Sequence, residues 1–153
     1  RTCILTCVLC PRFTVSPRWS LQSMSKSRLL TQQLSSAARS KDVLNIVRSQ
    51  ATLDEINVTA ALHRIAHLAH TSQEVSWVLR QPIFHNLASY VEDPMFLWEA
   101  DIRTLSTTLW AFARLRWKGE AELAWTIPLL SRRVRDLLQN GCGKMQSLAT
   151  LAW

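Results

Sequence analysis

The sequence predicts an all-α protein, an α-solenoid of helical-hairpin repeats preceded by a disordered leader. The composition is 48% apolar with only three glycines and five prolines, which suits packed helices better than a β-sandwich with its many turns. Apolar residues recur at helical spacing in separate segments, and two of these segments are similar in sequence. Because one such unit cannot bury its apolar stripe alone, we expect the units to stack with a period of about 43–47 residues.

The first 41 residues form a separate compositional segment. They carry seven of the eighteen Lys and Arg residues, eight serines and four threonines, and they contain no acid, because the first carboxylate is Asp42. This composition is typical of an organelle transit peptide, and a basic disordered leader of another kind is the alternative. We expect residues 1–41 to direct the protein to the mitochondrion, with the chloroplast as the alternative, and residues 42–153 to form the helical-repeat domain.

The charge of the remaining chain is balanced. Eleven basic residues accompany eleven acidic ones from Asp42 onward, so the net charge of +7 arises in the leader and does not predict a basic binding face. The apolar stretch at residues 3–10 is too short to span a bilayer. We therefore expect a soluble protein without a membrane partner.

Two groups of side chains have the spacing of metal ligands. Three cysteines near the N-terminus (C-x3-C-x2-C) match the cluster motif of radical-SAM enzymes, but no alternation of strands and helices follows them. His63, His67 and His70 share one helix face, yet Arg64 lies beside the first pair and no carboxylate is near. We interpret the cysteines as incidental and the histidines as surface or groove residues. With no phosphate loop, nucleophile motif or paired carboxylates either, we expect no metal, cofactor, small-molecule substrate or catalysis.

The repeat is clearest in two segments of equal length. Residues 54–68 (DEINVTAALHRIAHL) align without a gap with residues 101–115 (DIRTLSTTLWAFARL), at an offset of 47. A third copy begins at Lys144 and stops inside its helix, so we expect units at about 42–70, 73–117 and 120–153, the last one truncated. Four aligned pairs are identical: Asp54 and Asp101, Leu62 and Leu109, Ala66 and Ala113, Leu68 and Leu115.

Each copy predicts one amphipathic helix. Asp54 and Asp101 are placed to cap the helix start, where a carboxylate accepts hydrogen bonds from free backbone N–H groups. Ala66 and Ala113 are small, which favours the close crossing of another helix. The stripes that we expect in the core are Val58, Leu62, Ile65 and Ala69 in the first copy and Leu105, Leu109, Phe112 and Leu115 in the second.

Partner helices are expected between these copies, at residues 41–49, 73–91 and 120–139. Pro82 and Pro128 lie 46 residues apart and predict that the last two partner helices kink or restart there. Breaks before the next copies are predicted at Asp93-Pro94 and Asn140-Gly141.

The strings LSTTLWAFARL (residues 105–115) and MQSLATLAW (residues 145–153) resemble the L-x-x-x-L-W-A-x-A-x-L helix of octotricopeptide-repeat proteins and of the related repeats before RAP domains in FAST-kinase-like proteins. INVTAALHRIAHL (residues 56–68) looks like a diverged copy, with His63 in place of the tryptophan. The resemblance covers about residues 42–153. It departs from the family in its longer repeat, its neutral charge and the lack of a RAP domain in this sequence. Because those families bind RNA in mitochondria and chloroplasts, the resemblance implies a role in organellar transcript stability, processing or translation.

Cations and indole rings are the candidates for contacts with single-stranded RNA, since cations neutralise phosphates and planar rings stack on bases. A solvated helix face is the alternative interpretation of the cations, and packing between repeats is the stronger interpretation of the indoles. The phosphate candidates are Arg114, Arg116, Lys118, Arg132, Arg133 and Arg135, and the stacking candidates are Trp110 and Trp153.

A protein-binding solenoid of the HEAT or armadillo kind is the alternative function. Its period of about 40–47 residues fits the spacing, and the neutral charge of the repeats favours it. The W-A-F-A-x-L string favours RNA. We therefore expect an RNA-binding helical-repeat protein that is not an enzyme, with other proteins as a second class of partner.

Overall fold

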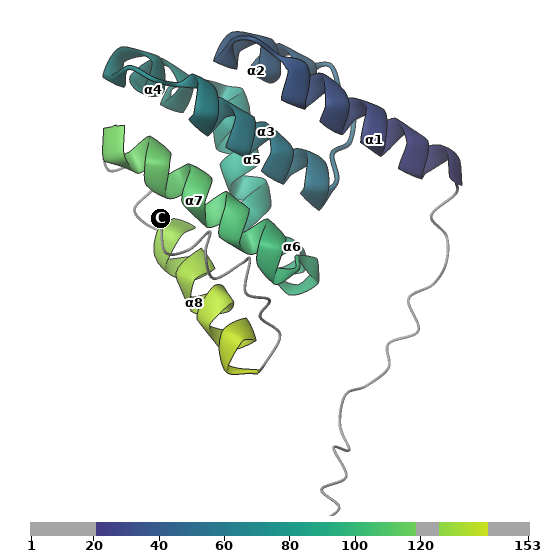
Figure 1. Cartoon of the computed structure of the whole chain (residues 1–153), viewed down its shortest axis with the longest axis vertical. Coiled ribbons are helices and arrows are strands. Elements are labelled where there is room, and N and C mark those ends of the chain that lie inside the picture. Colours follow the sequence, from purple (N-terminus) through teal and green to yellow (C-terminus); the bar gives the residue numbers. More distant parts are fainter. Residues whose placement is uncertain (1–20, 119–125, 141–153) are drawn as a thin grey trace, which may run out of the picture.

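The computed structural model describes residues 21–118 and 126–140, and the side chains within 26–115 and 126–140. These residues form eight helices and no strand, which confirms the predicted all-α class (Figure 1). In chain order the helices are α1 (Leu21–Ser36), α2 (Ser40–Arg48), α3 (Glu55–Leu68), α4 (Ser72–Leu79), α5 (Pro82–Glu92), α6 (Pro94–Glu99), α7 (Ile102–Lys118) and α8 (Thr126–Gln139).

Three helices, α1, α3 and α7, lie side by side in a row with α3 in the middle (Figure 1). Contacts at both ends of α1 and α3 set their relative direction. Near the two helix starts, the Ser27 hydroxyl donates to the carboxylate of Asp54. Near the two helix ends, the guanidinium of Arg64 donates to the carbonyl of Ala37 over 2.7 Å. Helices α1 and α3 therefore run parallel.

Two polar contacts fix α7 against α3. The buried hydroxyl groups of Thr59 and Thr108 share a hydrogen bond of 3.1 Å. Closer to the C-terminal ends of both helices, Nε of Arg114 donates to the carbonyl of Ala66 over 2.7 Å. These contacts join residues that are 49 and 48 positions apart. Because the sequence repeat has an offset of 47, equivalent turns of the two copies lie next to each other in space.

The remaining helices connect the members of this row. Helix α2 packs on α1 and α3, and α5 crosses behind α3 (Figure 1). The predicted partner helices at 41–49 and 73–91 are confirmed by α2 and by the pair α4 and α5. The predicted restart at Pro82 is also confirmed, because α4 ends at Leu79 and Pro82 opens α5. Proline suits this first position since its missing N–H would have no helical partner there.

Helix α8 packs on α7 and α5. It begins at Thr126, so that Pro128 falls in its first turn, where proline is tolerated. The first part of the predicted partner helix, residues 120–125, lies outside the described residues. Helix α8 ends at Gln139, directly before the predicted break at Asn140.

The two aspartates at equivalent positions of the repeat cap their helices, as predicted. The carboxylate of Asp54 accepts a hydrogen bond of 2.7 Å from the backbone N–H of Asn57. The carboxylate of Asp101 accepts one of the same length from the N–H of Thr104. Each cap satisfies a donor that the first helical turn leaves free, and an N-cap of this kind contributes about 1 kcal/mol.

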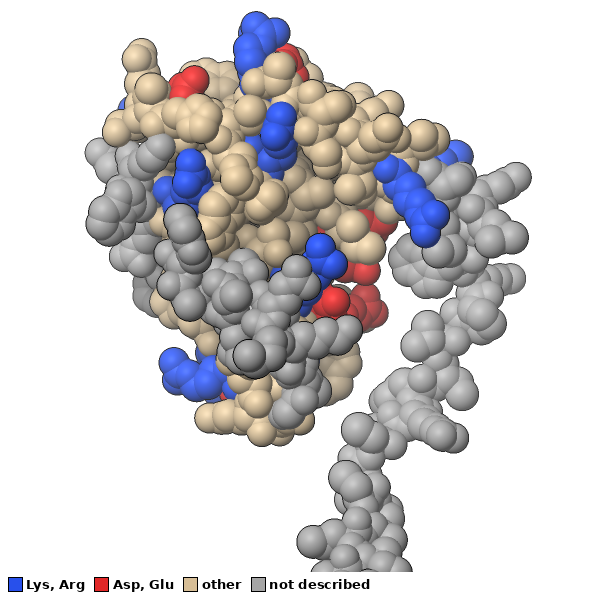
Figure 2. All heavy atoms as spheres, viewed as in Figure 1, with Lys and Arg blue, Asp and Glu red and all other residues tan. Residues whose placement is uncertain are grey.

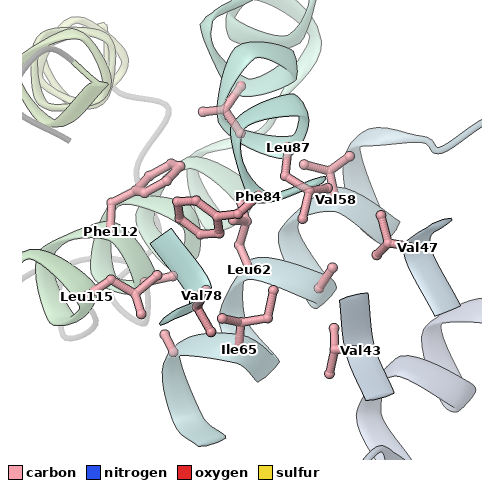
Figure 3. Packing of buried hydrophobic residues seen from close by; sticks show 14 of the residues in the cluster. Val43, Val47, Val58, Leu62, Ile65, Val78, Phe84, Leu87, Phe112 and Leu115 are labelled. Carbon is pink, nitrogen blue, oxygen red and sulfur yellow. The ribbon is translucent and has the colours of Figure 1, made fainter. Parts of the chain in front are cut away.

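The predicted apolar stripes form the core. Val58, Leu62 and Ile65 are fully buried, and Figure 3 shows them between side chains of α2 and α5. In the second copy Leu105, Phe112 and Leu115 are fully buried, while Leu109 is half-buried. Phe84 of α5 meets Phe112 edge to face, with ring centroids 6.3 Å apart. Each fully buried side chain of this size contributes about 1.5–3 kcal/mol.

The expectation of a disordered leader as far as residue 41 is not confirmed. Residues 21–36 form α1, and α2 already starts at Ser40. Leu30, Leu34 and Ala37 recur at helical spacing and are buried against the neighbouring helices. The acid-free composition predicted a leader, but composition does not determine whether a segment packs. Packing depends on the apolar stripe, which is buried here. Residues 1–20 lie outside the described residues.

One finer expectation needs correction. Ala66 is fully buried, as expected for a crossing helix, but Ala113 is exposed. Helix α7 covers Ala66, whereas the equivalent neighbour of Ala113 would come from residues 144–153, outside the described residues. The predicted break at Asp93-Pro94 is confirmed, because α5 ends at Glu92. The short helix α6 follows at once, and Asp93 caps it by accepting from the N–H of Met95.

Candidate nucleic-acid interface

A cluster of planar and cationic side chains lies where α3 and α7 meet. The ring centroid of Trp110 is 5.1 Å from that of His63 and 4.9 Å from that of His67. The two histidine rings are 4.5 Å apart and nearly perpendicular. The guanidinium of Arg114 lies 5.5 Å from the centre of the Trp110 ring, within the range of a cation–π contact. We name His63, His67, Trp110 and Arg114 the His–Trp–Arg cluster.

The repeat explains why these side chains meet. His63 and Trp110 occupy equivalent positions of the two copies, and so do His67 and Arg114, at the offset of 47. Since equivalent turns of α3 and α7 lie side by side, each pair is brought together across the helix interface. His67 is exposed and the other three side chains are half-buried. The cluster therefore reaches the surface. Its half-buried side chains, Trp110 among them, also pack between the two repeats, which is the role that we expected for this indole.

Burial lowers the pKa of His63 below its ordinary value of 6.5, and the nearby His67 and Arg64 lower it further. Burial also lowers the pKa of His67, followed by the charges of Arg114, Arg64 and His70. Both imidazoles of the cluster are therefore neutral at pH 7. Each then offers one N–H donor and one nitrogen acceptor rather than a positive charge.

Three arginines each bind the C-terminal end of a helix that neighbours their own. Arg64 of α3 donates to the carbonyl of Ala37 just behind α1. Arg114 of α7 donates to Ala66 in the last turn of α3. Arg133 of α8 donates to Leu97 in α6 over 2.8 Å. Carbonyl groups at a helix end lack intrahelical donors and carry partial negative charge, so a guanidinium is well suited to cap them.

Two of the predicted phosphate ligands, Arg114 and Arg133, therefore already donate hydrogen bonds to backbone carbonyl groups. Arg114 and Arg133 keep part of their hydrogen-bonding capacity, because a guanidinium has five N–H donors. Arg132 and Arg135 lie on α8 with exposed side chains. Among the predicted cations that the structure describes, these two are the ones most accessible to a phosphate group.

Three other predicted site residues fall outside the described side chains. Arg116 and Lys118 belong to the last turns of α7, but their side chains are not among those described. Trp153 lies in the segment 141–153, outside the described residues.

The sequence analysis did not single out Trp98. Its side chain is 74% exposed, and the guanidinium of Arg133 lies 5.4 Å from the centre of its ring. The segment that holds it had been interpreted only as a break between helices. Trp98 lies between Leu97 and Glu99 in a helix of only six residues, which is too short to show a period from which the exposure of Trp98 could be predicted.

The charges on the described surface are dispersed. Figure 2 shows the Lys and Arg side chains as separate groups on this face, divided by uncharged surface. The one ion pair within the described part joins Arg39 and Asp42, over 3.2 Å. This agrees with the equal numbers of acids and bases after residue 41, and it means that any nucleic-acid contact depends on local clusters rather than on a broad basic face.

A second feature is a hollow of about 510 Å³ between the loop that precedes α3 and helix α5. Apolar side chains line most of it, including Leu53, Val58, Ile83 and Leu87, and Tyr90 stands at its edge. Burial raises the pKa of Tyr90. Four acids raise that pKa further, namely Glu55, Asp54, Asp93 and Glu99. The hollow therefore combines an apolar floor with the cation Arg48 in its lining and with negative charge near Tyr90.

Within residues 21–118 and 126–140, no three His, Cys, Asp or Glu side chains are grouped so that they can hold a metal ion. None of the helices in this part of the chain has both the length and the hydropathy that are needed to cross a membrane.

Comparisons of the chain with protein-family models, with curated proteins and with solved structures gave no match.

Proposed function

We propose that this chain is part of an α-solenoid that binds single-stranded RNA and acts in organellar RNA metabolism. The parallel row of α1, α3 and α7, joined by α2 and by α4 and α5, supports the stacked-repeat arrangement, because equivalent turns are in contact. The further copy that the sequence predicts from Lys144 lies outside the described residues.

The observation that carries the proposal is the His–Trp–Arg cluster. It places a half-buried indole, two neutral imidazoles and a guanidinium together at the surface between two repeats. Unpaired bases of RNA are recognised by flat rings that stack on them and by neutral groups that both donate and accept hydrogen bonds. Arg114 supplies a cation for the adjacent phosphate through donors that do not bind Ala66.

The organelle and the pathway are proposed from the composition of the first 41 residues and from the sequence resemblance. The acid-free composition of the first 41 residues and the resemblance to octotricopeptide and FAST-kinase-like repeats favour a mitochondrial protein, with the chloroplast as the alternative. The same resemblance favours a role in transcript stability, processing or translation.

Fluorescence anisotropy of the full chain with a labelled single strand of roughly 15–20 nucleotides tests the proposal, at about 50 mM and about 200 mM salt. We expect binding that weakens with salt and is stronger for the single strand than for a duplex. The double variant Arg132→Ala/Arg135→Ala should bind more weakly. The control variant Arg48→Ala/Arg80→Ala removes the same charge from exposed positions elsewhere and should bind nearly as well as the parent.

Absence of single-strand binding at the lower salt concentration would contradict the proposal. Equal losses in the two double variants would show that the attraction depends on net charge alone, without a defined site on α8.

A protein-binding solenoid is the second candidate function, and the hollow beside Tyr90 favours it. An apolar floor with Arg48 in its lining and with Glu55 and Asp54 near Tyr90 suits a peptide that carries apolar side chains and charges of both signs. Glu55→Lys should weaken such a peptide complex while leaving RNA binding unchanged or stronger, so this variant separates the two functions.

A further inference from the structure

Trp98 is the most exposed of the large apolar side chains in the described part of the chain. It is 74% accessible, compared with 41% for Trp77 and 61% for Met95. Leaving an indole in water forgoes the stabilisation that its burial would provide. Neither a crossing helix nor a loop of the described residues covers it.

The geometry of α6 holds this ring outward. Phe96 and Ala100 are buried, and each lies two positions from Trp98. Two residues correspond to about 200° around a helix, so Trp98 points away from the side that is anchored in the core. Asp93 caps the start of α6 and fixes the short helix further. Exposure of the ring therefore follows from the packing of its neighbours.

Arg133 is fixed beside the ring before any ligand arrives. Its Nε donates to the carbonyl of Leu97 over 2.8 Å, and a terminal nitrogen reaches the carbonyl of Trp98 at 3.5 Å. These contacts hold the guanidinium 5.4 Å from the centre of the indole. The pair therefore needs little ordering on binding, which reduces the entropy cost.

We propose that Trp98 and Arg133 form a stacking platform for one unpaired nucleobase of the RNA. This inference rests on the proposed function and adds a second contact point to it. An indole face accepts any base, and an adjacent guanidinium strengthens stacking through its planar cation. Glu99, the exposed neighbour of Trp98, repels phosphate, so the platform receives the base rather than the backbone. Arg132 precedes Arg133 on α8, and its exposed side chain supplies a further cation for the RNA backbone.

The test measures the affinity of the full chain for two labelled single strands of equal length and charge. One strand carries bases throughout, and the other consists of abasic sugar-phosphate units. Trp98→Ala should weaken binding of the base-containing strand by roughly 5- to 150-fold, the range for loss of one stacked base, without changing binding of the abasic strand. Trp98→Phe should retain most of the affinity. Trp77→Ala, at the other exposed indole, is the matched control and should behave like the parent.

The outcomes separate this inference from the proposed function. If the parent binds the base-containing strand and Trp98→Ala binds it equally well, the platform is refuted while the RNA function stands. If Trp98→Ala weakens both strands equally, the ring does not stack on a base, and the platform is refuted as well. If the parent binds neither strand, both proposals fall. Because Trp98 is so exposed, Trp98→Ala should keep the circular dichroism spectrum and melting temperature of the parent.

Discussion

Replacing Arg114 by alanine should destabilise the protein even though arginine is a surface residue type. Its Nε donates to the carbonyl of Ala66 over 2.7 Å in a partly buried position, and its guanidinium lies over Trp110. A hydrogen bond from a charged group contributes about 1.5–3 kcal/mol, and a partly exposed cation–π contact contributes about 0.5–1 kcal/mol. Because the two contributions are not additive, we expect the free energy of unfolding to fall by about 2–3 kcal/mol.

Urea denaturation followed by circular dichroism measures this change directly. A loss of 2–3 kcal/mol corresponds to a melting temperature lower by about 4–12 °C in a chain of this size. Arg132→Ala is the matched control, because it removes the same charge from an exposed site and should change the free energy by less than about 0.5 kcal/mol. Equal stabilities of these two variants would refute the idea that Arg114 caps α3 and joins neighbouring repeats.

Three further predictions test other parts of the structure. Leu34→Ala should cost about 2–5 kcal/mol in urea denaturation, because Leu34 is fully buried; no change would mean that α1 is not part of the core. Thr59→Val should cost about 1–3 kcal/mol by leaving the hydroxyl of Thr108 unpaired, whereas the double variant Thr59→Val/Thr108→Val should approach the parent, and additive losses would contradict the pairing. Because the folded-state pKa values of His63 and His67 lie below 6.5, stability should fall as the pH drops from 6.5 towards those lowered values. The variant His63→Gln/His67→Gln should lose this part of the pH dependence, and an unchanged profile would contradict it.

Features that depend on neighbouring residues along the chain could be predicted from the sequence. Helical spacing of Val58, Leu62 and Ile65 identified the buried face of α3, since side chains three or four positions apart share one side of a helix. Asp54 could be identified as an N-cap because its acceptor lies beside free N–H groups of the next turn. Pro82 indicated the start of α5 because, within a helix, proline is well tolerated only in the first turn.

The roles of the surface side chains depend on how the helices pack against one another. Arg114 and Arg133 looked alike in sequence to Arg132, yet the first two bind carbonyl groups of other helices and the third is exposed. The sequence alignment paired His63 with Trp110 but gave no sign that their rings lie 5.1 Å apart, because that depends on the parallel packing of α3 and α7.

Tertiary contacts also decided whether a segment packs at all. The stripe of Leu30 and Leu34 was overlooked because the composition around it is that of a leader, and α3 supplies the surface that buries it. Trp98 is the opposite case, an apolar side chain that stays exposed to water. Phe96 and Ala100 occupy the buried side of its helix, so the indole lies on the other side. Local sequence sets helix starts and apolar faces, whereas burial and hydrogen-bond partners are set by whichever helix lies alongside.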